Sequence, residues 1–229
     1  MNILRLKLGN ANIYFIRSAV GWMLIDTGIP GKSKKILRFM RKHNIQPCKI
    51  QLIVITHAHY DHAGNLEYLK FLTNARIFIH RSEADIIEQA KVVLPAPVTP
   101  LAKLGIRMFS LFKRPMKFNP VKADETIQYK TDLRPYGFSA SIVPTPGHTE
   151  GSVSVMFENG NTFTGDTCFN LKFTRHIIPP FINDKKALLQ SWHTLNENGV
   201  KHFYPGHGKP FDFNKFIKSF KRLEKMSQQ

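Results

Sequence analysis

A buried strand that runs directly into a cluster of metal-ligand side chains constrains the fold of this chain more than any other feature. Residues 50–55 read Ile-Gln-Leu-Ile-Val-Ile, an apolar and β-branched stretch that is typical of a buried strand. The next segment, 56–62, reads Thr-His-Ala-His-Tyr-Asp-His and holds four ligand side chains: His57, His59, Asp61 and His62. Because open α/β sheets place binding sites where strands end, the pattern predicts an α/β fold with a metal site at a sheet edge.

Three later segments each place one more ligand side chain after a predicted strand, in what we expect to be a turn. Two of them share a Pro-Gly-His pattern, with His148 after Pro-Gly and His207 after Pro-Gly, and the third has Asp166 after Gly165. Proline and glycine shape tight turns, so each ligand is aimed at a fixed position. With the first cluster they make five histidines and two aspartates, a number that suits two metal ions. Imidazole and carboxylate favour a borderline metal such as zinc.

The chain is strongly basic, with 33 Lys and Arg against 16 Asp and Glu in 229 residues, a formal charge of +17. Such an imbalance favours anionic partners, whether small acidic substrates, acidic membrane surfaces or nucleic acid. The basic residues are spread over 32–42, 103–122 and 209–225 and do not form one tract. A nucleic-acid partner is therefore considered but not favoured over general solvation of a basic surface.

The periodicity of apolar residues predicts two similar halves of strands followed by a helix. The predicted strands are 3–8, 12–17 and 21–26 as a hairpin meander, then 50–55, 75–79, 125–129, 139–144, 152–157, 161–165 and 201–204. The predicted helices are 32–43, one that contains Leu66 to Leu72, one with Ser82 as N-cap that runs to about Ala90, then 184–198 and 213–226. We find no linker, so residues 1–229 are expected to form one domain.

Residues 92–122 differ in kind from the rest of the chain. Five prolines and several basic residues surround an apolar stretch from Leu101 to Phe112, which predicts a short amphipathic helix. It is either a lid over a substrate pocket, a surface that contacts a membrane peripherally, or a helix packed on its own domain.

The N-terminus lacks a secretory signal, and no run reaches the roughly 20 apolar residues that span a bilayer, so we expect a cytoplasmic protein. Two cysteines, Cys48 and Cys168, do not make a disulfide framework. Cys168 lies near Asp166, and a small buried residue is a better interpretation of it than a metal ligand.

Taken together, these motifs resemble those of the metallo-β-lactamase-fold hydrolase superfamily, in the same order and over nearly the whole chain, from the turn at 24–28 to that at 205–208. The resemblance implies an αββα sandwich of two mixed β-sheets flanked by helices. It implies that the first metal is held by His57, His59 and His148, the second by Asp61, His62 and His207, and that Asp166 bridges both. Asp26 matches an aspartate that supports the site from behind the ligands.

The ligand set predicts the chemistry. Two ions that share a water lower its pKa from about 16 towards neutrality, so a metal-bound hydroxide can attack an ester, thioester or lactone carbonyl. We expect two Zn²⁺, with iron or manganese as alternatives, and Asp61 is the natural residue to orient the nucleophile and pass on a proton. A small acyl or anionic substrate is favoured, with Lys172, Arg175 and His176 as candidate contacts for an anionic group.

Lactonases and glyoxalase-II-like hydrolases are the branches whose ligand set is most similar. In the lactonases an aromatic hydroxyl often assists the leaving group; Tyr60 and Tyr204 are candidates, although packing roles are favoured for both. A metal-dependent nuclease or phosphodiesterase, or a basic nucleic-acid-binding module, remains the alternative function. The sequence leaves the oligomeric state open.

Overall fold

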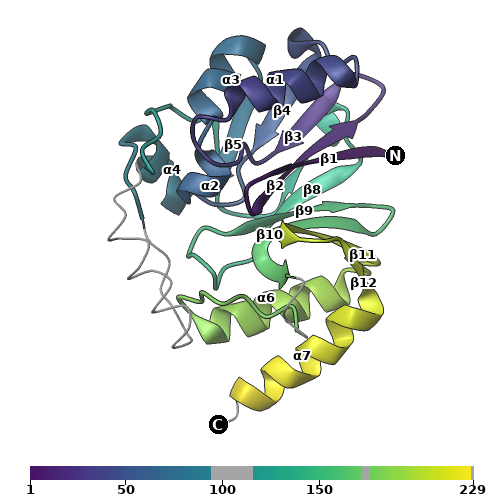
Figure 1. The fold of residues 1–229 in the computed structure, drawn as a ribbon. Helices are drawn as coiled ribbons and strands as arrows, with labels where there is room; N and C mark the ends of the chain where they lie inside the picture. Colours follow the sequence, from purple (N-terminus) through teal and green to yellow (C-terminus); the bar gives the residue numbers. More distant parts are fainter. Residues whose placement is uncertain (94–115, 172–175, 228–229) are drawn as a thin grey trace.

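The structure is a computed structural model that describes residues 1–93, 116–171 and 176–227. Helices form the two outer layers and β-strands form the two inner layers, with α1 (Ser33–Lys42) and α3 (Leu66–Thr73) on one side and α6 (Lys185–Glu197) and α7 (Phe213–Ser227) on the other (Figure 1). This arrangement is the αββα sandwich with mixed sheets that the resemblance implies, and it is confirmed.

The first half of the strand system has the order β6-β5-β4-β3-β2, with β1 paired to β2. Its strands are β1 (Asn2–Leu8), β2 (Ala11–Arg17), β3 (Trp22–Ile25), β4 (Ile50–Val54), β5 (Arg76–His80) and β6 (Glu125–Ile127). The first three strands are antiparallel, which confirms the predicted meander, and β3 to β6 run parallel.

The second half has the order β11-β10-β9-β8-β7, with β12 paired to β11. Its strands are β7 (Thr131–Asp132), β8 (Ala140–Pro144), β9 (Val153–Phe157), β10 (Asn161–Asn170), β11 (His202–Gly208) and β12 (Phe211–Asp212). The two halves join where β11 pairs with β2 through His207 and Ala11. A candidate ligand therefore stands at the junction of the halves.

The helices lie close to their predicted positions, except for the one-turn helix at Tyr60–Ala63, which was not predicted. They are α1 (Ser33–Lys42), α2 (Tyr60–Ala63), α3 (Leu66–Thr73), α4 (Arg81–Glu88), α6 (Lys185–Glu197) and α7 (Phe213–Ser227), with short 3₁₀ turns η1 (Pro47–Lys49) and η2 (Arg134–Tyr136). The prediction of Ser82 as an N-cap is wrong. Strand β5 runs straight into α4, so the cap is His80, whose Nδ1 accepts the Ser82 N–H at 3.3 Å.

Three apolar cores fill the three spaces between the four layers. The strands β2 to β5 of the first half are buried on both faces, so their side chains alternate between two of these cores. On β2, Ile13 and Phe15 face α1, whereas Tyr14 and Ile16 face the second half. The third core lies under α6 and α7 around Trp192. Each fully buried aromatic or large aliphatic side chain stabilises the fold by roughly 1.5–3 kcal/mol.

The structure tests the predictions for the 92–122 segment and for the two cysteines only in part. Residues 94–115 of the 92–122 segment lie outside the described residues, and beyond them Phe118 packs into the first core. Cys168 is buried in the third core and Cys48 is exposed, and both are free thiols. Among the described helices, none combines the length and the apolar character that a membrane span needs.

Candidate metal centre

The segment after β4 is held by one buried aspartate. Asp26 follows β3, the strand beside β4, and its Oδ1 accepts the backbone N–H of Thr56 at 2.8 Å and its Oδ2 accepts the Thr56 hydroxyl at 2.9 Å. Asp26 has φ 60°, a conformation that few residues other than glycine adopt. Because the end of β4 is fixed in this way, the chain turns out of the sheet at His57 with a defined direction.

Helix α2 presents the next two ligand candidates. It is a single turn with His59 at the N-cap position, and Asp61 and His62 are its second and third residues. His62 Nδ1 lies 2.8 Å from Asp26 Oδ2, and the backbone carbonyl of His62 accepts both the N–H and the hydroxyl of Thr27. The ring and the backbone of His62 are therefore both anchored, and its Nε2 is directed away from Asp26.

His148 is aimed by a tight turn between β8 and β9. Gly147 has φ 132°, and a Cβ there would lie 2.5 Å from the backbone of Leu188 on α6, so only glycine fits. His148 Nδ1 donates to the carbonyl of Phe181 at 2.8 Å, which turns Nε2 inward. The predicted turn and its Pro-Gly-His chemistry agree with the structure at this position.

Asp166 and His207 lie inside strands, which corrects the prediction that both follow strands in turns. They are on the neighbouring parallel strands β10 and β11, whose pairing continues past them. Two irregularities in the register, between Phe163 and Gly165 and between Gly165 and Phe169, bend β10 around the site. The strands thus extend through the ligands because the pairing shifts without ending.

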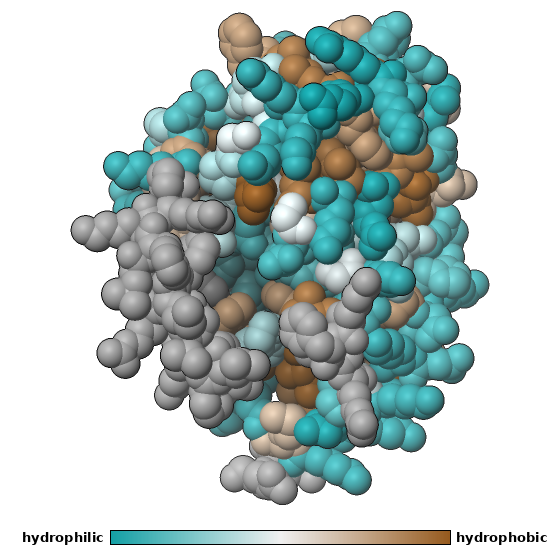
Figure 2. Space-filling view, viewed as in Figure 1, coloured by the Kyte–Doolittle hydropathy of each residue, from teal (hydrophilic) through white to brown (hydrophobic). Residues whose placement is uncertain are grey.

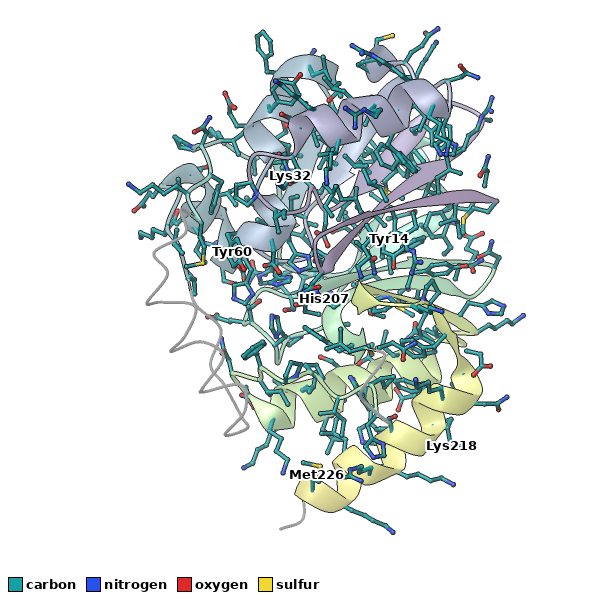
Figure 3. The ribbon with its side chains drawn as sticks, in the orientation of Figure 1. Tyr14, Lys32, Tyr60, His207, Lys218 and Met226 are labelled. Carbon is teal, nitrogen blue, oxygen red and sulfur yellow. The ribbon has the colours of Figure 1, made fainter. Side chains whose placement is uncertain are left out.

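Gly206 makes the room for this arrangement. A Cβ at Gly206 would lie 2.3 Å from Asp166 Oδ1 and 2.7 Å from His62 Cε1. His207, the next residue, donates Nδ1–H to the carbonyl of Asn10 at 2.9 Å and stacks on Phe169 with a centroid distance of 4.7 Å. Figure 3 shows His207 near the middle of the molecule, at the level where the two halves meet.

The structure brings all seven predicted ligand side chains together, as two groups of three with Asp166 between them. In the first, His59 Nδ1 lies 2.9 Å from His57 Nε2 and 3.1 Å from His148 Nε2. In the second, His207 Nε2 lies 3.2 Å from His62 Nε2 and 3.4 Å from Asp61 Oδ2. Each group has the size and donor set to hold a metal ion.

Asp166 stands between the two groups. Its Oδ2 lies 3.5 Å from His148 Nε2 and 3.3 Å from His207 Nε2, and its Oδ1 lies 3.4 Å from His62 Nε2. Together with His57 and His62 it forms a third possible ligand group that links the other two. Oδ1 is buried and makes no hydrogen bond within the described residues, which is costly for a carboxylate without a cation.

The hydrogen bonds made by the histidine Nδ1 atoms that point away from the cage test whether a metal fits. A backbone carbonyl only accepts, so Nδ1 of His148 and of His207 must carry the proton, and His62 Nδ1 meets the Asp26 carboxylate in the same way. The Nε2 lone pairs of these rings are then left to face the cage in the neutral state. Imidazoles whose other nitrogen is bonded to carbonyl or carboxylate are the usual form of metal-ligating histidine. The residues present therefore fit a divalent cation.

The electrostatics differ between the two groups. Burial lowers the pKa of His57 and His148, and it lowers the pKa of His59 to about 3, so these rings stay neutral. In the second group burial opposes protonation as well, but Asp166 and Asp61 outweigh it and raise the pKa of His207 to about 10. Burial is similarly outweighed at His62, where Asp166 and Asp26 raise the pKa. Without a cation, the second group holds protons in its place.

Other candidates from the sequence have different roles or lie outside the described residues. The Tyr204 hydroxyl donates to Asn161 Oδ1 at 3.0 Å, and its ring stacks on Phe163, so it belongs to the core between the sheets. Tyr60 packs partly against the first core, and burial raises its pKa to about 12. Lys172 and Arg175 fall outside the described residues, whereas His176 is half-buried.

Sequence reasoning missed Glu83, a carboxylate on α4 that is 3% exposed and accepts hydrogen bonds from both chain segments that supply the first ligand group. It also missed Asn12 and Tyr14, which both donate to the carbonyl of Pro205 and so hold the backbone before His207. Nothing in the local sequence around these residues signals their partners, which are far away in the chain.

The comparisons with known proteins agree with this geometry. Residues 6–207 match the metallo-beta-lactamase superfamily. A probable metallo-hydrolase of Methanocaldococcus jannaschii is 30% identical over 192 residues, which cover 82% of each chain. A hydroxyacylglutathione hydrolase of Pelagibacter ubique is 25% identical over 62% of this chain and 45% of its own length. A protein crystallised in a di-iron-bound form has a similar fold, with a TM-score of 0.69, 23% identity and coverage of 96% of this chain and 98% of that one.

Proposed function

The chain belongs to the metallo-beta-lactamase superfamily and is a metal-dependent hydrolase, and from that membership we propose that it binds two divalent ions and hydrolyses an ester, thioester or lactone. The observation that carries the proposal is the buried cage in which two groups of three donors flank Asp166, whose Oδ2 approaches a histidine of each. Zinc is the favoured ion because of the imidazole and carboxylate donors. Iron is an alternative, since one structural neighbour holds two iron ions.

The proposed roles follow from the two groups. His57, His59 and His148 would hold the first ion, and Asp61, His62 and His207 the second, with Asp166 in contact with both. When bound, ions in this cage would supply the positive charge that ionises a water at neutral pH and stabilises negative charge on the substrate oxygen. The buried rings of the first group exclude further water, so the charges of the site act in a medium of low polarity.

Exposure indicates the side from which a substrate enters. The side chains of His57 and His62 are 0% exposed, whereas Asp61 is 20% exposed, the largest value in the cage. A substrate therefore meets the cage beside Asp61. This carboxylate is partly exposed to solvent and directs Oδ2 towards His207 Nε2, 3.4 Å away, so its other oxygen would orient a water and pass on a proton.

A carbonyl substrate is supported by a named relative. The hydroxyacylglutathione hydrolase acts, by its name, on an acylated glutathione, and it shares 25% identity with this chain. We extend to this chain only the class of bond, an acyl group joined to oxygen or sulfur. The basic composition favours an acyl group or leaving group that carries negative charge.

Metal analysis followed by a substrate panel tests the proposal. Purified protein should hold about two metal ions per chain and hydrolyse at least one of an aryl ester, an acyl thioester and a lactone. His148→Ala and His207→Ala should each lose an ion and the activity, whereas His193→Ala, at a partly exposed histidine on α6, should change neither. A metal-replete protein that is inert towards every carbonyl substrate contradicts the proposal.

A second candidate, a phosphodiesterase or nucleic-acid-binding protein, is favoured by the charge of the N-terminal part. Residues 1–60 contain ten Lys and Arg and a single acid, Asp26, which is buried. Most of these Lys and Arg side chains are exposed, and hydrophilic residues cover much of the face in Figure 2. Binding of DNA or RNA that weakens steeply with salt, together with cleavage of a phosphodiester, would favour this candidate over the carboxylic ester hydrolase.

A further inference from the structure

Glu83 connects the two segments that supply the first ligand group. Its Oε2 accepts the backbone N–H of Ala58 at 2.9 Å, and its Oε1 accepts the backbone N–H of Gly151 at 3.3 Å. Ala58 lies between His57 and His59, and Gly151 lies three residues after His148. One carboxylate therefore spans the two backbone segments that carry all three histidines of this group.

The approach of α4 to the second segment requires glycine. A Cβ at Gly151 would lie 2.3 Å from Glu83 Cγ and 2.6 Å from Ser82 Oγ, well inside contact distance. Gly151 does not need a left-handed backbone, so its role is to let the chain pass close to α4. The start of α4 is itself fixed, because His80 caps it directly at the end of β5. Glu83 thus projects from a rigid base.

A carboxylate is well suited to this link. It offers an acceptor oxygen to each of two N–H donors at once, and charged acceptors make stronger bonds to backbone N–H groups than neutral ones do. Its side chain is 3% exposed, and water is largely excluded from both bonds. None of the ion pairs found among the described residues involves Glu83, so this carboxylate is used for the two backbone groups.

We propose that Glu83 is a positioning residue that holds the His57–His59 segment and the His148 segment at a fixed separation and so sets the metal affinity of the first group. This inference rests on the proposed function, because it concerns the same metal site. The second group does not depend on Glu83 in this way. Its rings are oriented by Asp26 at His62 and by the carbonyl of Asn10 at His207.

Glu83→Gln is the direct test. The amide keeps the shape of the side chain but turns one acceptor into a donor that faces an N–H, so one of the two bonds is lost. The two segments stay joined by the backbone bond from Val153 N to the carbonyl of Thr56, 2.9 Å long, so the variant is expected to fold. Changes in residues that orient metal ligands weaken metal binding by about 10–100-fold, and we expect a loss in that range.

The effect of Glu83→Gln on each ligand group is measured separately, as zinc affinity in competition with a chelator, in two variants that each retain one group. His207→Ala leaves the first group intact, and there Glu83→Gln should weaken binding about tenfold or more. His148→Ala leaves the second group intact, and there Glu83→Gln should change the affinity less than about threefold. Glu88→Gln, at an exposed glutamate of the same helix, is the matched control and should have no effect in either background.

The outcomes separate the inference from the proposed function. If Glu83→Gln leaves the first group unchanged, or weakens both groups equally, the inference is overturned while the metal site stands. If the unsubstituted protein binds no metal, the proposed function fails first and the inference fails with it. Should Glu83→Gln fail to fold, as judged by circular dichroism, Glu83→Asp decides instead: it keeps two acceptors but is too short to reach both N–H groups, and the same selective loss is expected.

Discussion

Asp26 Oδ2 lies 2.8 Å from His62 Nδ1, and the same carboxylate binds the backbone and the hydroxyl of Thr56. One buried side chain thus orients a ring of the second ligand group and the start of the segment that carries the first. The bond also fixes the ring so that its Nε2 faces His207, 3.2 Å away. The geometry of the cage therefore depends on a residue that is not itself among the ligand donors.

Asp26→Asn should weaken zinc binding and hydrolysis without unfolding the protein. Asparagine tolerates the left-handed φ of this position, so the backbone is retained. The carboxylate interacts with the Thr56 N–H, the Thr56 hydroxyl and His62 Nδ1, and asparagine has only one oxygen left to accept these hydrogen bonds. We therefore expect about a 10–100-fold loss of metal affinity. Chelator competition measures the affinity, and Asp85→Asn, at an exposed position of α4, serves as the control. Affinity equal to that of the unsubstituted protein would refute the proposed role of Asp26.

Removal of metal should lower the melting temperature. An ion that binds only the folded chain stabilises it by about 4 kcal/mol when its concentration is 1,000 times its dissociation constant. Calorimetry with zinc and with a chelator should therefore give clearly separated transitions. In His148→Ala and His207→Ala the gap between these transitions should narrow, because one group is broken in each. An unchanged melting temperature on chelation would mean that the cage binds no ion tightly.

Metal binding should release protons mainly from the second group. Burial opposes protonation of His207, yet Asp166 and Asp61 raise its pKa to about 10, so at pH 7 the metal-free ring holds a proton that a cation must displace. His62 behaves in the same way, whereas burial keeps the rings of the first group neutral. Filling the second group at pH 7 should therefore release protons, and filling the first should release few.

The zinc affinity of the second group should increase as pH rises. A raised pKa means that protonated His207 stabilises the metal-free protein below pH 6.5 and that this contribution is lost as pH rises through about 10. Zinc affinity of the second group should therefore increase with pH over this window. Titration calorimetry of His148→Ala, in two buffers with different ionisation enthalpies, counts the protons. Equal proton release from the two groups would contradict the proposed charge states.

The sequence carried enough information to predict the candidate ligands and, through the family resemblance, the supporting Asp26, but not the other residues that hold the ligand segments. The strand that runs into His57 is visible because a continuous apolar run meets a polar cluster, and such a pattern needs no tertiary knowledge. The structure brings Asp166 and His207 into the cage, but the prediction that they lie in turns is wrong, since β10 and β11 stay paired through shifted register. Glycine suggested a turn at both positions, whereas Gly206 instead provides space beside Asp166.

The contacts of Glu83 could not be predicted for a physical reason. Its partners, Ala58 and Gly151, are 25 and 68 residues away, and both contribute backbone groups that leave no mark in the sequence. The same holds for the cap of α4, where Ser82 has the expected chemistry but the abrupt passage from β5 gives the position to His80. Local propensity identifies an element, and tertiary contacts decide its ends.

Gly206→Ala should remove metal from the site by steric displacement. A Cβ would lie 2.3 Å from Asp166 Oδ1 and 2.7 Å from His62 Cε1, so the carboxylate between the two groups must move. The backbone at this position does not have a positive φ, and the effect is therefore one of space rather than of backbone strain. We expect both groups to lose affinity, because Asp166 approaches the histidines of each.

Gly199→Ala is the control that separates a steric clash in the cage from backbone strain. Gly199 has φ 67° and no atom within 4 Å of its would-be Cβ, so alanine there costs about 1–2 kcal/mol of backbone strain and touches nothing in the cage. Metal content by elemental analysis should fall in Gly206→Ala and stay at the level of the unsubstituted protein in Gly199→Ala, although the latter melts at a lower temperature. Full metal content in folded Gly206→Ala would show that Asp166 does not need its observed position to hold the ions.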